Sequence, residues 1–299
     1  MTLKTILLIL SSTLLSACAS TGLPLINAKE KLTSNHEVSA NIAYGKQPWQ
    51  KLDLHTPTIS NKHNFPVLIF FYGGSWDSGK KEQYYFAAAA FAKLGYLVVI
   101  PDYIKYPQGK FPEFIQDGAA AISWVKNNIN AYGGDASNIF IAGHSAGAHL
   151  GALLVSDKAY LQQQHGLQPS DINAFAGLAG PYNFTPKRPE IVLIFEPASN
   201  YPKMQVPNYI DGDEPSMLLA HGLNDTTVLI KNKTTTIDAL KKQNGDYESI
   251  DYPDVTHTGI LLALSSLFDG KIQPANDIDK FFQKHLTTQR ALSSLGDRN

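Results

Sequence analysis

A glycine-rich pentapeptide near the middle of the chain constrains the fold more than any other feature. Residues 143–147 read Gly-His-Ser-Ala-Gly. They follow an apolar run at 138–142 and precede a stretch of small and apolar residues typical of a helix. A strand, a sharp turn and a helix in this order hold a nucleophilic serine at the carboxyl edge of a sheet, and the flanking glycines let the backbone bend that tightly. Ser145 is therefore a candidate nucleophile.

Short apolar runs alternate with helical segments along most of the chain. Eight runs are predicted as strands, the first two as an antiparallel pair: 40–44, 50–54, 66–72, 96–100, 139–142, 175–179, 217–220 and 247–252. Helices are expected between them: 80–94, 112–128, 145–155, 228–243 and 274–285. This alternation predicts an α/β fold with a mostly parallel eight-stranded sheet and helices on both faces. A proline-rich insert at about 181–215 predicts a small irregular cap.

Two further strand ends carry the groups that acyl transfer from a serine requires. The strand predicted at 217–220 runs into Asp225, and the one at 247–252 runs into His257. Serine, acid and histidine in this order, each after a strand, are typical of a triad in which the histidine takes the serine proton and the acid orients the histidine. Asp254 is the rival acid. A helix cap is the alternative role for Asp225.

The turn after the strand at 66–72 contains candidate donors for a developing oxyanion. Two consecutive glycines free backbone N–H groups at the end of this apolar strand. The expected oxyanion hole combines donors from this turn with the residue after the nucleophile: Gly74, Ser75 and Ala146. Two aromatic residues that flank the turn are candidates for the substrate pocket: Tyr72 and Trp76.

Together these motifs resemble the α/β-hydrolase carboxylesterases near the hormone-sensitive-lipase group. The closest resemblance is to a small-cap branch that contains bacterial feruloyl-esterase-like carboxylesterases and kynurenine formamidases. It covers residues 40–285 and includes further landmarks of that branch: Asp102-Tyr103, Phe111-Pro112, Asp117 and the Tyr-Gly-Gly-Asp at 132–135. The resemblance implies the α/β-hydrolase fold. Tyr72 departs from the pattern, because the group usually has histidine at that position.

The triad and the resemblance predict a serine carboxylester hydrolase that acts on small-molecule esters through an acyl-enzyme intermediate. This chemistry needs no metal, nucleotide or other cofactor. Two alternatives stay open at this point. One is an arylformamidase-type amide hydrolase with the same triad, and the other is a non-catalytic, tethered binding protein of the envelope built on a hydrolase scaffold.

The charge balance argues against one class of partner. The chain has 25 Lys and Arg against 26 Asp and Glu, which gives a formal net charge of −1. No basic block is present that could neutralise a row of phosphates. Nucleic acid is therefore not an expected partner.

The first residues predict export and attachment to a membrane. Lys4 precedes an apolar stretch at 5–15 that is too short to span a bilayer. Residues 15–18 read Leu-Ser-Ala-Cys, which resembles the lipobox of bacterial lipoproteins, in which the signal is cut before an acylated cysteine. A disulfide within the chain is excluded, because Cys18 is the only cysteine. An ordinary signal peptide cleaved near Ala19 and an unprocessed apolar tail are the alternatives.

These observations predict the organisation of the chain. It comprises a lipoprotein signal peptide, a flexible tether from lipidated Cys18, one catalytic α/β-hydrolase domain and a tail, with these bounds: 1–17, 18–38, 39–288 and 289–299. Ala19 stands where an acidic residue would favour retention in the inner membrane. The expected location is therefore the bacterial cell envelope, at the outer membrane and facing the periplasm.

Overall fold

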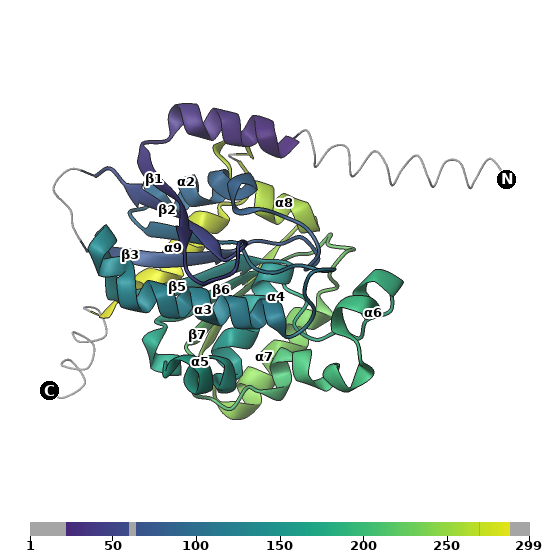
Figure 1. The fold of residues 1–299 in the computed structure, drawn as a ribbon. Coiled ribbons are helices and arrows are strands. Elements are labelled where there is room, and N and C mark those ends of the chain that lie inside the picture. Colours follow the sequence, from purple (N-terminus) through teal and green to yellow (C-terminus); the bar gives the residue numbers. More distant parts are fainter. Residues whose placement is uncertain (1–21, 60–63, 269, 288–299) are drawn as a thin grey trace, which may run out of the picture.

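The computed structural model describes residues 22–59, 64–268 and 270–287, in which eight strands form one sheet (Figure 1). The strand order is β1-β2-β4-β3-β5-β6-β7-β8. The pairs β1–β2 and β2–β4 are antiparallel and the others are parallel. The strands are β1 (His36–Ala43), β2 (Lys51–Pro57), β3 (Phe65–Phe71), β4 (Leu97–Pro101), β5 (Gly134–His144), β6 (Ala174–Leu178), β7 (Ser216–Gly222) and β8 (Tyr247–Tyr252). The predicted mostly parallel eight-stranded sheet is confirmed.

The centre of the sheet is buried on both faces. Strands β4, β6 and β7 are buried along their whole length, and β3 along nearly all of it. Their sequences are continuous apolar runs because helices cover both faces of a parallel sheet. The outer strands differ: β1 is mostly exposed, and β8 has a single buried residue, Tyr252. The core therefore lies under the central strands, whose carboxyl ends share one edge.

Helices cover the sheet from two sides (Figure 1). Helix α3 packs against α4 and α5 on one face, and α2 contacts α9 on the other. After residue 33, the described helices outside the cap are η1 (Lys81–Tyr84), α2 (Tyr85–Lys93), α3 (Glu113–Asn128), η2 (Ile129–Tyr132), α4 (Ala146–Ser156), α5 (Lys158–His165), η3 (Pro169–Asp171), α7 (Lys231–Gln243), α8 (His257–Leu262), η7 (Ser266–Phe268) and α9 (Pro274–Gln283). The 3₁₀ helices η2, η3 and η7 are absent from the sequence prediction, and so are two α-helices, α5 and α8. Both are short, with eight and six residues, so each has at most two turns of hydrophobic pattern.

The insert between β6 and β7 is an irregular cap, as predicted. It contains one short helix and three 3₁₀ turns: α6 (Pro189–Phe195), η4 (Ala198–Asn200), η5 (Pro202–Met204) and η6 (Val206–Asn208). Two residues of α6, Ile194 and Phe195, are fully buried. The carbonyl of Met204 also forms a 2.8 Å hydrogen bond with Nε2 of His149 in α4. The cap is thus packed onto α4, the helix that follows Ser145.

Residues 22–33, here called the N-terminal helix, are helical and lie along the domain (Figure 1). Ile26 is buried in the core. The side chain of Asn27 hydrogen-bonds to backbone atoms of η1 and α2, and the Oε1 atom of Glu30 accepts hydrogen bonds from Ser265 and Ser266. These contacts fix the helix to two different parts of the α/β domain.

The prediction of a flexible tether at 18–38 is therefore wrong from residue 22 onward, and β1 already begins at His36. The reason lies in the inward-facing positions of the helix. Asn27 and Glu30 are polar, so the sequence lacks a clear apolar stripe, and their hydrogen bonds replace apolar contacts. Residues 18–21, the predicted signal peptide and the whole of the predicted tail lie outside the described residues.

Two glycines allow the turn at residue 145 to sit close to the neighbouring strand. A Cβ added to Gly147 would lie 2.0 Å from the carbonyl oxygen of Phe71 and 2.5 Å from that of Tyr72. A Cβ on Gly143 would lie 2.6 Å from the carbonyl carbon of Gly147. All three contacts are with backbone, which cannot swing away as a side chain can. The start of α4 can therefore touch the end of β3 only because these positions lack side chains.

We expect Gly147→Ala to lower the free energy of unfolding by about 3 kcal/mol, because the added methyl group meets backbone. Gly118→Ala in α3 is the matched control. Its Cβ would meet only the side-chain ends of Leu150 and Leu154, at 2.7 and 2.9 Å, and these can move. The control should change the stability by less than about 1 kcal/mol, since alanine also favours the helix. Urea unfolding measures the stability of both variants. Equal losses of stability would contradict the claim that the backbone contact at Gly147 excludes a side chain.

Candidate active site

Ser145 lies at the sharp turn between β5 and α4, as predicted. Its φ and ψ angles are 54° and −121°, a conformation that non-glycine residues rarely adopt. Its N–H donates a 2.9 Å hydrogen bond to the carbonyl of Leu178 at the end of β6, which stabilises the strained turn. The side chain therefore stands at the carboxyl edge of the sheet, between two parallel strands.

The structure brings Ser145, His257 and Asp225 into one hydrogen-bonded chain. Nε2 of His257 lies 2.9 Å from Oγ of Ser145, and Nδ1 lies 2.7 Å from Oδ2 of Asp225. Because a carboxylate can only accept, Nδ1 carries the hydrogen, which leaves Nε2 free to accept from the serine hydroxyl. His257 is the first residue of α8 rather than a loop residue. This is the arrangement in which an imidazole can take a proton from a serine.

Asp225 orients His257 and does not cap a helix, because α7 begins only at Lys231. Its Oδ1 atom accepts hydrogen bonds of 2.8 Å from the N–H groups of Thr227 and Val228, while Oδ2 faces His257. Burial raises the pKa of this carboxyl, but the hydrogen bonds from His257 and from the backbone outweigh it and hold the pKa below 3.8. Within the described residues, the rival acid Asp254 makes no hydrogen bond to His257. Asp225 is thus an ionised acid that orients the imidazole.

Three other histidines near the site support its backbone. The ring of His144 is buried, which lowers its pKa to about 3, and its Nε2 hydrogen-bonds the carbonyl of His257 at 2.9 Å. His221 does the same for Val228 beside Asp225, and His149 for the cap. In the parts of the chain that the structure describes, no three His, Cys, Asp or Glu side chains are grouped to hold a metal. These histidines therefore act on the positions of the triad and the cap.

The turn after β3 places free N–H groups beside Ser145. A Cβ added to Gly73 would lie 3.2 Å from Cβ of Ser145, so this turn touches the serine. The φ angles of Gly74 and Ser75 are 131° and 51°, and their N–H groups donate no hydrogen bond to any other described residue. The N–H of Ala146 is in the first turn of α4, where the helix offers no acceptor. The three predicted oxyanion donors thus lie on the turns that meet at Ser145.

The carbonyl oxygens on this turn are held in place. The oxygen of Gly74 accepts from the N–H of Asp77 at 3.1 Å and from the N–H and Oγ of Ser78, both at 2.9 Å. In a trans peptide the C=O and the following N–H point in opposite directions. The bonds to Gly74 therefore direct the N–H of Ser75 away from Ser78.

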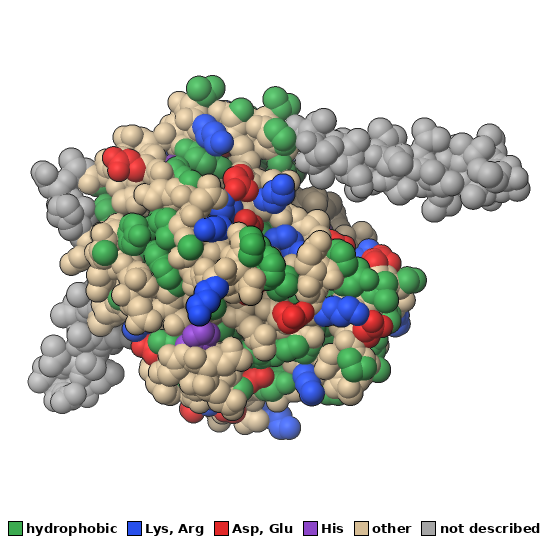
Figure 2. All heavy atoms as spheres, in the orientation of Figure 1, with side chains coloured by type: hydrophobic (Ala, Val, Ile, Leu, Met, Phe, Trp, Pro, Cys, Tyr) green, Lys and Arg blue, Asp and Glu red, His purple; other side chains and the backbone are tan. Residues whose placement is uncertain are grey.

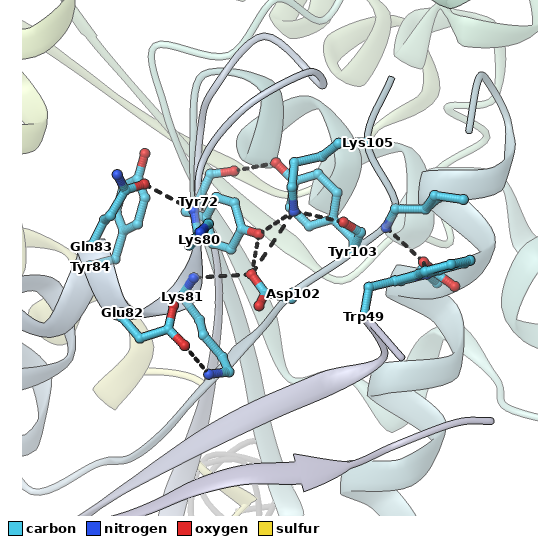
Figure 3. Close-up of polar contacts among 12 residues, drawn as sticks. Trp49, Tyr72, Lys80, Lys81, Glu82, Gln83, Tyr84, Asp102, Tyr103 and Lys105 are labelled. Atoms are coloured by element: carbon cyan, nitrogen blue, oxygen red, sulfur yellow. Dashed lines mark hydrogen bonds and ion pairs between the residues drawn. The ribbon is translucent and has the colours of Figure 1, made fainter. Parts of the chain in front are cut away.

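Tyr72 lies beneath the turn rather than in a pocket, so its assignment to the substrate pocket is wrong. Its side chain is fully buried and stacks between the rings of Tyr84 and Tyr103, at 5.0 and 4.9 Å. Figure 3 shows that its hydroxyl donates to Asp102 and accepts from Lys105. A buried phenol whose hydroxyl is bound to these two partners is not available to substrate. Its role is to support the turn.

Of the residues under the turn, Tyr84 and Lys105 are absent from the sequence prediction, in which Asp102 and Tyr103 are only landmarks of the resemblance. Tyr103 donates a 2.8 Å hydrogen bond to the carbonyl of Tyr72, and Tyr84 a 3.1 Å bond to the carbonyl of Gly73. Asp102 and Lys105 complete this polar group (Figure 3). One available signal was the tyrosine in place of the usual histidine at position 72, because a buried phenol needs a partner.

Trp76 joins the turn to the cap through aromatic contacts. Its ring stacks on Phe184 at 5.6 Å and meets the edges of Phe195 and His149 at 4.8 and 5.4 Å. The indole is 4% exposed, and its Nε1 has no hydrogen-bond partner among the described residues. The assignment of Trp76 to the substrate pocket stays a prediction.

Comparison with known proteins agrees with this geometry. The family model described as BD-FAE matches residues 52–240. The chain belongs to the BD-FAE family. Isoprenylcysteine alpha-carbonyl methylesterase ICME of Arabidopsis thaliana is 30% identical to this BD-FAE chain over 263 residues, which are 81% of this chain and 61% of the plant protein. Esterase LipC of Mycobacterium tuberculosis is 28% identical, with coverage of 67% and 54%.

This BD-FAE chain thus spans less than two thirds of the length of these two relatives. Among solved structures, a truncated carbohydrate esterase from gut microbiota superposes with a TM-score of 0.73 at 23% identity, covering 85% of this chain and 98% of that one. Esterase B from Lactobacillus rhamnosis gives a TM-score of 0.79 at 17% identity, covering 98% and 99%. These similarities confirm the α/β-hydrolase fold.

The lowered pKa of Asp225 predicts how its contribution to stability depends on pH. A carboxyl whose pKa is depressed by folding stabilises the native state above its unfolded value, and this contribution is lost as the pH falls through the folded pKa. We therefore expect the difference in unfolding free energy between the wild type and Asp225→Asn to be constant from about pH 7 to 5 and to shrink below about pH 4. Urea unfolding across this range measures it. A difference that grows on acidification would contradict the assignment.

Proposed function

We propose that this BD-FAE protein is a serine carboxylester hydrolase that uses Ser145, His257 and Asp225. The observation that supports this most directly is the hydrogen-bonded chain of the three side chains beside three N–H groups. The names of the similar proteins, a methylesterase and an esterase among them, agree with ester hydrolysis. A filled triad also favours an enzyme over a non-catalytic binding protein.

In the proposed reaction, Oγ of Ser145 attacks the ester carbonyl while Nε2 of His257 takes its proton. The negative charge that develops on the carbonyl oxygen is stabilised by the N–H groups of Gly74, Ser75 and Ala146. The imidazolium then gives its proton to the leaving alkoxide, and the alcohol departs from the acyl-enzyme. A water molecule repeats the sequence, which releases the acid and restores the serine. Asp225 keeps Nδ1 protonated throughout.

We expect Ser145→Ala to lower kcat on p-nitrophenyl acetate by about 10⁴- to 10⁶-fold, because no other group can form the acyl-enzyme. The thermal midpoint should change little, since the side chain is small and only partly buried. Labelling by a fluorophosphonate probe should be lost with the activity. Unchanged turnover in Ser145→Ala would refute the proposed mechanism.

Substitution of the two candidate acids, Asp225 and Asp254, tests which of them orients His257. Asp225→Asn should lose most of the activity, whereas Asp254→Asn should retain it. The same assays on N-formylkynurenine and on feruloyl esters compare the amide and aromatic ester alternatives with acetyl esters through kcat/KM. A preference for N-formylkynurenine would favour the arylformamidase function.

We also propose that the protein is anchored to a membrane by a lipid on Cys18. Support comes from the sequence: the apolar stretch at 5–15 and the Leu-Ser-Ala-Cys motif at 15–18. A diacylglyceryl group and an amide-linked chain would give stable attachment, since two lipid signals suffice. Among the described residues, no helix has the length and apolar character needed to cross a membrane. The proposed location is the outer membrane of a bacterial envelope, facing the periplasm.

Intact-mass measurement tests the anchor. The wild type extracted from membranes should lack residues 1–17 and carry the added mass of its acyl chains, because cleavage and acylation both occur at Cys18. Cys18→Ser should keep the signal segment and carry no lipid. Activity on p-nitrophenyl acetate serves as the control and should be equal in both. A wild-type mass without lipid would contradict this proposal and leave the ester hydrolase proposal intact.

A further inference from the structure

The N–H of Gly74, one of the proposed oxyanion donors, belongs to a peptide unit that a buried tyrosine holds from behind. The hydroxyl of Tyr84 donates a 3.1 Å hydrogen bond to the carbonyl oxygen of Gly73. In a planar trans peptide the C=O of Gly73 and the N–H of Gly74 point in opposite directions. Fixing the oxygen therefore fixes the direction of the N–H. Gly74 needs such a constraint, because glycine lacks the side chain that restricts its neighbours.

We propose that Tyr84 is a positioning residue that aims the N–H of Gly74 at the reacting carbonyl, and that the N-terminal helix holds Tyr84 in place through Asn27. This inference rests on the proposed ester hydrolysis and on the oxyanion hole assigned above. It adds to them an element that lies outside the sheet and outside the region matched by the BD-FAE model.

Tyr84 is built into its position by packing on both sides. Its ring is 6% exposed, stacks on Tyr72 at 5.0 Å with an 18° angle between the planes, and lies 6.1 Å from Phe86. Burial raises the pKa of its hydroxyl to about 12, so the group stays protonated and remains a donor. Tyr103 fixes the preceding carbonyl, that of Tyr72, in the same way.

Asn27 holds the backbone on both sides of Tyr84. Its Nδ2 donates to the carbonyls of Glu82 and Gln83 at 3.2 and 2.9 Å, and its Oδ1 accepts from the N–H of Phe86 at 3.0 Å. The amide therefore uses both of its ends, and Asn27 is itself 8% exposed. A continuous path of contacts then leads from the N-terminal helix through Asn27, Tyr84 and Gly73 to the N–H of Gly74.

The second donor of this turn has a separate support. The carbonyl that precedes Ser75 is held by backbone N–H groups of the turn itself, so it does not depend on Tyr84. Removing the Tyr84 hydroxyl should thus disturb one donor of three. Loss of a whole oxyanion donor reduces kcat by roughly 10²- to 10³-fold, so a donor that is present but poorly aimed should cost about tenfold.

The test is Tyr84→Phe in the full chain, which keeps the ring and removes the hydroxyl. We expect kcat on p-nitrophenyl acetate to fall about tenfold with KM unchanged, since the oxyanion exists only in the transition state. Affinity for an aryl trifluoromethyl ketone, which forms an oxyanion on Ser145, should fall by the same factor. Asn27→Ala should lower kcat and ketone affinity together, by less than Tyr84→Phe.

Tyr96→Phe is the control, because it also removes the hydroxyl of a buried tyrosine, which donates to Oδ1 of Asp279 at 2.8 Å and accepts from Nε2 of Gln283 at 3.4 Å. It should leave kcat and ketone affinity unchanged, while its thermal midpoint falls about as much as that of Tyr84→Phe. Wild-type kcat in Tyr84→Phe would overturn the inference. An equal fall of kcat in Tyr84→Phe and Tyr96→Phe would also overturn it, and so would a fall of kcat/KM that comes from a higher KM. Activity in Ser145→Ala would instead refute the proposed function, so the two failures are distinguishable.

Discussion

The direct contact between the backbone of the Ser145 turn and the end of β3 is the constraint on which the site depends. Gly147 and Gly73 leave no side chain between the two strand ends, so the serine and the turn with the free N–H groups meet without a gap. Any Cβ at Gly147 would force β3 and β5 apart at their carboxyl ends. The proposed triad and the proposed oxyanion donors can therefore face one substrate carbonyl, because no side chain separates them at these two positions.

A second layer lies beneath this contact and keeps it in register. The rings of Tyr72, Tyr84 and Tyr103 stack under the turn. The hydroxyls of Tyr103 and Tyr84 donate hydrogen bonds to the carbonyls of two consecutive residues, Tyr72 and Gly73. Aromatic rings provide bulk without flexible torsions, and their hydroxyls provide the directional contacts. The turn has three successive residues with positive φ: Gly74, Ser75 and Trp76. It thus packs on rigid side chains and not against solvent.

The sequence predicts the features that local rules determine. Continuous apolar runs indicated each central strand, and the glycines around Ser145 indicated the turn. The triad followed from topology, since parallel strands bring their ends to one edge and Asp225 and His257 each follow a strand. Features decided by contacts between distant segments could not be read in this way. The partner of the Tyr72 hydroxyl lies 30 residues away, and the N-terminal helix is held by polar side chains that resemble those of a linker.

The N-terminal helix changes what an anchor at Cys18 would mean. A flexible linker of twenty residues would have a mean span of about 25 Å, and the domain could rotate freely relative to the lipid. With the chain already docked at residue 22, the four peptide units from Cys18 can span at most about 14 Å. The helix end in Figure 1 lies on the side of α8 and α6, so that side of the domain would remain nearest the bilayer. Figure 2 shows apolar side chains at the top of the molecule, where Figure 1 places the N-terminal helix. In this helix Leu25 and Leu32 are 71% and 87% exposed. An anchor at Cys18 would therefore restrict the orientation of the domain at the membrane as well as its distance from it.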